Sequence, residues 1–223
     1  MATLTAGGQV LLLLPEKCIF LPESDTLLVA DVHIGKAVSF RALGVPVPGG
    51  TTGETLAMLT SLVRRLALRR IVFLGDFLHS ARSHAPATMA AVAQWRGAHA
   101  DLALTLVRGN HDDRAGDPPA HLDIEAVDEP LMHGGLALCH HPRPHAGAYV
   151  LAGHLHPCVN VSGRARDWLR LPCFWFRAHV GVLPAFGAST GMQPIRTAPG
   201  ERVFAATPQQ VFERAPRRAA KRR

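Results

Sequence analysis

Five short polar signatures, each following an apolar run, carry the residues of this chain that could do metal chemistry. They are Asp31-Val-His33, Gly75-Asp-Phe-Leu-His79, Gly109-Asn-His-Asp112, His140-His141 and Gly153-His-Leu-His156. Carboxylates, an amide oxygen and imidazoles together form a mixed oxygen and nitrogen donor set. Such a set suits first-row divalent ions such as Mn²⁺, Fe²⁺ or Zn²⁺, and it suits Ca²⁺ or Mg²⁺ poorly because of the histidines.

The number of donors indicates more than one ion. Two carboxylates, one amide and four imidazoles are too many for a single four-coordinate ion. Two ions about 3.5–4 Å apart, sharing one carboxylate, would use them all and leave room for a phosphate. Taken alone, each histidine has an ordinary alternative as a surface or packing residue, since the chain contains 13 of them. As an ordered set, the signatures predict a dinuclear site of the hydrolase type.

The apolar runs before the signatures are the elements that must position them. Short apolar runs ending in Gly or Asp are typical of buried strands. These runs cover residues 26–30, 71–74, 102–107, 136–138 and 149–152. In open α/β sheets, ligands gather beyond the carboxyl ends of the strands, so loops far apart in sequence can meet at one point. We therefore expect a single site.

The remaining pattern predicts an α/β chain. Residues 9–14 and 18–21 flank a Pro-Glu-Lys turn and indicate an opening hairpin, while apolar periodicity predicts helices over 52–67 and 86–99. The signatures spread from residue 31 to residue 156 must share one fold. We therefore expect one domain over residues 1–213 of the 223.

The ordered set D-x-H, G-D-x-x-H, G-N-H-D, H and G-H-x-H resembles the calcineurin-like metallophosphoesterases, from about residue 28 to residue 157. The resemblance implies a four-layer αββα sandwich. The ligands that it implies are Asp31, His33 and His156 for the first ion, Asp76 as the bridge, and Asn110, His140 and His154 for the second. His140 is preferred to His141 because it ends the strand.

Three further residues stand where the resemblance implies catalytic groups. His111 follows a ligand directly, and it would protonate the leaving oxygen or stabilise the charge developing on it. Asp112 would orient His111. His79, three residues after Asp76, is similar to a histidine in the nuclease branch of the superfamily.

A narrower likeness covers about residues 10 to 207. The stretch from Asp31 to Thr52 and the late segment from Gly181 to Gly187 resemble the PdeM group of bacterial ligase-associated DNA damage response endonucleases. This likeness implies metal-dependent cleavage of DNA phosphodiesters by an endonuclease in DNA repair, with a helicase, exonuclease or ligase as a possible partner. We expect two divalent ions, with Mn²⁺ as the preferred metal, although Fe²⁺ and Zn²⁺ fit the same donors.

Other functions use the same fold. A phosphodiesterase or phosphatase acting on small nucleotides would need the same ligands, because the metal centre recognises phosphate and not the rest of the substrate. The family also includes scaffolds that have lost ligands, but all seven positions are filled here. Hydrolysis of lipid pyrophosphates at a membrane would call for an amphipathic cationic helix, which the sequence does not indicate.

The charge of +7 is concentrated at one end of the chain. Six of the 24 Lys and Arg residues lie from Arg214 onward, and the other 18 nearly balance 17 acidic residues. Residues 214–223 are therefore predicted to be a disordered basic tail, either a salt-dependent tether to a phosphate backbone or a solvated terminus. Lys36, Arg41 and Arg82 follow metal-site strands and are candidates for phosphate contacts or plain surface cations.

Location and assembly are less constrained. No segment resembles a signal peptide or is long and apolar enough to span a bilayer. The four cysteines form no C-x-x-C pair, which is typical of free thiols in a reducing compartment. We expect a cytoplasmic protein with no membrane partner; the sequence leaves its oligomeric state open.

Overall fold

A computed structural model describes residues 1–45, 51–162, 168–187 and 190–214 of the chain. Nearly all of the predicted basic tail lies outside these residues, as does the Pro- and Gly-rich part of the likeness at 46–50.

The first sheet has seven strands in chain order. They are β1 (Ala2–Ala6), β2 (Gln9–Leu13), β3 (Ile19–Leu21), β4 (Thr26–Val29), β5 (Arg70–Leu74), β6 (Ala103–Val107) and β7 (Glu125–Val127). The first four run antiparallel, and the expected hairpin is confirmed by the pairing of β2 with β3. From β4 onward the neighbours are parallel, as helical crossovers require.

Helices connect the parallel strands. The α-helices are α1 (Lys36–Ala42), α2 (Thr51–Leu66), α3 (Pro86–Gly97) and α4 (Asn110–Ala115), and the 3₁₀ turns are η1 (Ala81–His84) and η2 (Ala120–Leu122). In α2, Leu56, Leu59 and Leu62 lie on one face and are buried. The α3 helix begins at Pro86, whose fixed φ suits a first helical position. Both predicted helices are confirmed to within two residues.

The second sheet contains the later strands, in the order β14-β11-β12-β13-β10-β9-β8, with β15 paired to β12 and β16 paired to β15. Their bounds are β8 (Leu131–His133), β9 (Leu136–Leu138), β10 (Tyr149–Ala152), β11 (Pro157–Ser162), β12 (Trp168–Phe176), β13 (Val180–Val182), β14 (Gln193–Pro194), β15 (Arg202–Ala206) and β16 (Val211–Glu213). The parallel strands β9, β10 and β13 form its centre.

The two sheets share a core, and the alternation of side chains along the strands creates it. In β5, Val72 and Leu74 pack toward the second sheet with Leu138 and Phe174, whereas the intervening Phe73 packs among the helices. All five side chains are fully buried. Strands buried on both faces have continuous apolar sequences, which is why the apolar runs before the signatures indicate strands.

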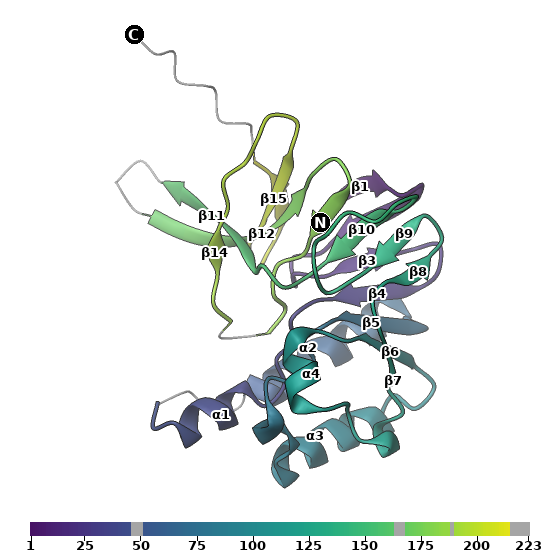
Figure 1. Cartoon of the computed structure of the whole chain (residues 1–223), viewed down its shortest axis with the longest axis vertical. Coiled ribbons are helices and arrows are strands. Elements are labelled where there is room, and N and C mark those ends of the chain that lie inside the picture. The colour runs from purple at the N-terminus through teal and green to yellow at the C-terminus, as the bar shows by residue number, and fades with distance from the viewer. Residues whose placement is uncertain (46–50, 163–167, 188–189, 215–223) are drawn as a thin grey trace.

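The expected α/β class and two-sheet architecture are confirmed. Figure 1 shows the helices gathered on the outer side of the first sheet, with the second sheet on the other side. Within the described ranges every helix precedes β7, so the helical layer that the resemblance implies over the second sheet is not provided by these residues. None of the described helices is both long and apolar enough to cross a bilayer.

Candidate metal centre

All five signatures meet at the carboxyl ends of their strands. Asp31 and Asp76 lie two residues after β4 and β5, Asn110 lies three residues after β6, and His140 and His154 lie two residues after β9 and β10. The two sheets are linked there because the backbone N–H of His154 donates to both oxygens of Asp31, at 3.1 and 2.9 Å. The ligands predicted from sequence are therefore neighbours in space.

The predicted ligands of the second ion converge on His140. Its Nε2 lies 3.1 Å from Asn110 Oδ1, 3.0 Å from His154 Nδ1 and 3.5 Å from Asp76 Oδ1. The Nδ1–H of His140 donates to the carbonyl of Leu74 at 3.1 Å, which leaves a lone pair on Nε2. Several lone pairs thus face one point, an arrangement that a cation stabilises.

The predicted ligands of the first ion form a second group, with one donor atom each from Asp31, His33 and His156 within 4.8 Å of one another. His156 donates through Nδ1 to the carbonyl of Gly191 at 3.1 Å, so its Nε2 has a lone pair 3.5 Å from Asp31 Oδ1. That Nε2 is buried and has no hydrogen-bond partner among the described residues. Both groups fit the divalent ions that the sequence predicts.

Burial shifts the pKa values of several predicted metal ligands. It lowers the pKa of His33 to about 2, with neighbouring cationic and imidazole groups adding to the effect. Burial likewise lowers the pKa of His140 and His154 and raises that of Asp76. The imidazoles are therefore neutral, as ligation requires, and a bound cation would stabilise the charge of the buried carboxylate.

Five of the seven predicted ligands have a left-handed backbone. Their φ values lie between 47° and 71°, at Asp31, His33, Asp76, His154 and His156. Residues other than glycine avoid this region, and they are held there only where the surroundings demand it. Concentration of such residues at the strand ends is typical of functional loops.

Two glycines allow the strand ends to approach closely. A Cβ on Gly75, which has a φ of 75°, would collide with the imidazole of His140. A Cβ on Gly153 would lie 2.6 Å from Asp31 Oδ2. Both signatures thus need glycine for steric reasons.

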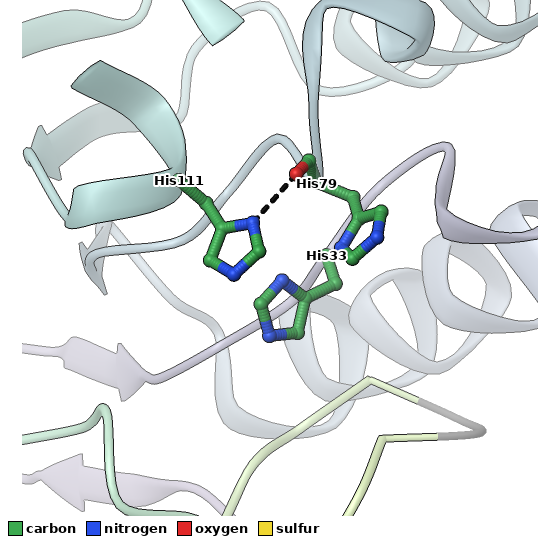
Figure 2. A group of neighbouring side chains, drawn as sticks. All are labelled: His33, His79 and His111. Atoms are coloured by element: carbon green, nitrogen blue, oxygen red, sulfur yellow. Dashed lines mark hydrogen bonds between the residues drawn. The ribbon is translucent and has the colours of Figure 1, made fainter. Parts of the chain in front are cut away.

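His33, a predicted ligand of the first ion, lies in a cluster with His79 and His111 (Figure 2). The rings of His33 and His111 are 5.0 Å apart, and those of His79 and His111 are also 5.0 Å apart and stacked. His111 donates from Nδ1 to the carbonyl of His79 at 2.6 Å, as the dashed line in Figure 2 marks. Its Nε2 is thereby turned toward Asp76, 3.9 Å from Oδ2.

Asp112 contacts a different partner from the one expected. Its buried carboxylate accepts from the backbone N–H groups of Phe77, Leu78 and Gly109, at 3.3, 2.9 and 3.0 Å. No hydrogen bond joins it to the His111 ring among the described residues, where the His79 carbonyl takes that role. Asp112 therefore positions the loop that carries His79, and acts on His111 only through it.

Comparison with solved structures gives a strong match. A crystal structure of the Pseudomonas putida nuclease MPE is 45% identical to the chain, with a TM-score of 0.84, and the match covers 95% of this chain and 98% of that one. The chain is a metallophosphoesterase. No family model matches the chain, and a search of curated proteins finds no match.

Two other solved structures are much less similar to this metallophosphoesterase. The phosphoesterase YfcE from E. coli is 14% identical, with a TM-score of 0.41, over 81% of this chain and 86% of that one. The protein AQ665 from Aquifex aeolicus, of unknown function, is 16% identical, with a TM-score of 0.40, over 59% of this chain and 78% of that one.

The structure of the metallophosphoesterase adds a residue that the sequence analysis missed. Glu129 accepts from the backbone N–H groups of His140 and His141 at 2.8 and 2.9 Å, and from His141 Nδ1 at 2.8 Å. Burial opposes the charge on Glu129, but these donors outweigh it and lower its pKa. The carboxylate thus fixes the loop of a predicted metal ligand, and nothing in its local sequence signals this.

Proposed function

We propose that this metallophosphoesterase is a nuclease that hydrolyses phosphodiester bonds of DNA, with two Mn²⁺ ions as its native metals. The observation that carries the proposal is the pair of donor groups meeting at Asp76, with the His111 ring beside them. The P. putida match supports the substrate class, since that protein is called a nuclease. We further propose a role in DNA repair, a cytoplasmic location and a helicase, exonuclease or ligase partner. A pull-down from the native cell would test the partner.

Each residue has a defined task in the proposed reaction. Divalent ions held by the seven ligands would neutralise the phosphate and lower the pKa of the attacking water. His111 directs Nε2 into the site because its Nδ1–H is occupied by the His79 carbonyl. In the imidazolium form, in which Nε2 also carries a proton, it would donate to a phosphate oxygen or protonate the leaving oxygen to give the alcohol. Asp112 keeps the His79 loop in place.

The experiment compares substrates under one set of conditions. Purified protein with Mn²⁺ is assayed on single-stranded, duplex and nicked DNA, on bis-p-nitrophenyl phosphate and on cyclic nucleotides. We expect cleavage of DNA and of the small diester. Cleavage of cyclic nucleotides without cleavage of any DNA would replace the proposal by a nucleotide phosphodiesterase.

Two variants separate metal binding from proton transfer. His111→Ala should retain its ions and lose about 10²–10⁴-fold in kcat, the usual contribution of a positioned acid. Asp76→Asn should lose bound metal along with activity. Measuring the metal content of both variants distinguishes the two roles, and loss of metal from His111→Ala would contradict the role proposed for it.

A further inference from the structure

A cavity of about 180 Å³ lies beside the ligands of the first ion. His33 borders it on the side of the metal centre, Lys36 and Phe40 of α1 and Thr55 of α2 form other walls, and Gly187 lines it from the loop after β13. Because His33 belongs to both the cavity and the metal group, a molecule in the cavity would be adjacent to a phosphate held at the ions.

The size of the cavity restricts what it can hold. Its volume of about 180 Å³ exceeds the roughly 30 Å³ share of one water several times over. It is smaller than the roughly 300–1,000 Å³ of pockets for whole drug-sized ligands. A single flat ring system is therefore the appropriate size, with the rest of the molecule outside.

The walls are apolar with a few polar groups. Val32 and Ala37 contribute apolar surface, and both are buried. The hydroxyls of Thr55 and Thr190 donate to the backbone carbonyls of Thr51 and Gly187, at 2.9 and 3.1 Å. Their oxygens keep lone pairs that can accept from N–H groups at the edge of a heterocycle.

One wall is aromatic and cationic. Phe40 is half-buried, and its ring stacks on His79 with the centroids 5.9 Å apart and the planes at 19°. Lys36 Nζ lies 5.8 Å from the centre of the Phe40 ring. An aromatic face with a nearby cation is the combination on which unpaired nucleobases stack while their phosphates are neutralised.

We propose that this cavity binds the nucleobase next to the cleaved phosphate, with Phe40 as its stacking surface. The inference rests on the proposed nuclease function and adds a base-binding subsite to it. A base that enters the cavity must be unpaired and turned out of its stack. Since the walls contact the flat ring that all bases share, the subsite should accept different bases.

The test removes the base and keeps the backbone. A set of single-stranded oligonucleotides of one sequence carries an abasic residue at successive positions, and cleavage at every phosphate is measured with the wild-type protein and Mn²⁺. We expect cleavage to fall about ten-fold at the phosphate on one fixed side of the abasic residue. Undiminished cleavage on both sides would overturn the subsite, whereas failure to cleave the intact oligonucleotide would overturn the nuclease function itself.

A variant tests the cavity from the protein side. Ala37→Leu fills space in the cavity, and Ala37→Ser at the same position adds little volume. We expect Ala37→Leu to reduce the ratio of kcat/KM for the intact oligonucleotide over its abasic form several-fold, and Ala37→Ser to preserve that ratio. An equal loss on both substrates would overturn the proposal; if Ala37→Leu fails to fold, the abasic series decides alone.

Discussion

Glu129 is a side chain whose effect on the metal centre can be isolated. It lies outside the predicted ligand set and holds the backbone of His140 and the ring of His141. Glu129→Gln removes a negative acceptor with little change of shape. Partners that hold metal ligands in place commonly contribute 10–100-fold to affinity, so we expect the second ion to bind about ten-fold more weakly, as measured by calorimetric titration.

The control for Glu129 is another carboxylate with similar contacts away from the site. Glu201 accepts from the Trp175 indole and from the backbone N–H of Ala198, at 2.9 and 2.8 Å. Glu201→Gln should leave both ions bound with unchanged affinity. If the two variants weaken metal binding equally, the hydrogen bond between Glu129 and the His140 backbone is not the cause.

The pH dependence of metal binding follows from the buried imidazoles. Their pKa values are lowered by burial, that of His33 to about 2, so the folded protein keeps these rings neutral at a pH where free histidine is protonated. Protons therefore compete with metal at these rings only well below the ordinary histidine pKa of about 6.5. We expect the Mn²⁺ affinity to be constant from pH 8 through about 6.5 and to fall only at a lower pH; a decline between pH 8 and about 6.5 would contradict this.

At the scale of the elements, the close approach of β4 and β10 depends on Gly153. Gly153→Ala would place a methyl group against Asp31, so the loop must shift. We expect loss of the first ion and a fall in the free energy of unfolding of about 1–3 kcal/mol, as for other overpacked sites. Metal content and urea denaturation measure the two effects.

Gly97→Ala provides the matched control. A Cβ at Gly97, the last residue of α3, meets nothing within 4 Å. Because alanine favours a helix over glycine, this variant should be as stable as the wild type or more so, with both ions retained. Equal destabilisation by the two substitutions would mean that crowding at Asp31 is not responsible.

The elements also show how far the sequence could predict this molecule. The strands before the signatures were predictable because they are buried on both faces, and α2 because its leucines repeat at helical spacing. The hydrogen bonds of Glu129 were not predictable, since they depend on where the β8–β9 hairpin carries His140. The contact of Asp112 was not predictable either. This carboxylate is next to His111 in sequence but hydrogen-bonds to a loop more than thirty residues away.

At the scale of the whole molecule, the metal centre joins the two sheets. Asp31, His33, Asp76 and Asn110 follow strands of the first sheet, and His140, His154 and His156 follow strands of the second. Ions that bind only the folded protein stabilise it by about 2.7 kcal/mol at a hundredfold excess over Kd. We expect chelation by EDTA to lower the melting temperature by about 5–10 °C, measured by calorimetry.

The bridging ligand provides the control for that measurement. Asp76→Asn should not retain the two metal ions. It should therefore melt at nearly the same temperature with and without EDTA. An unchanged melting temperature of the wild type after verified metal removal would show that the ions do not contribute to holding the sheets together.

The left-handed ligands have a consequence for the choice of ion. Each such residue costs about 1–3 kcal/mol and persists only because the surrounding fold fixes it. The donors are therefore held at set positions before any ion arrives, and a cation whose bond lengths do not match them cannot easily move them. Discrimination among Mn²⁺, Fe²⁺ and Zn²⁺, which accept the same donor types, then falls to geometry. In this protein the backbone fixes the positions of the donors, and the side chains set their chemical type.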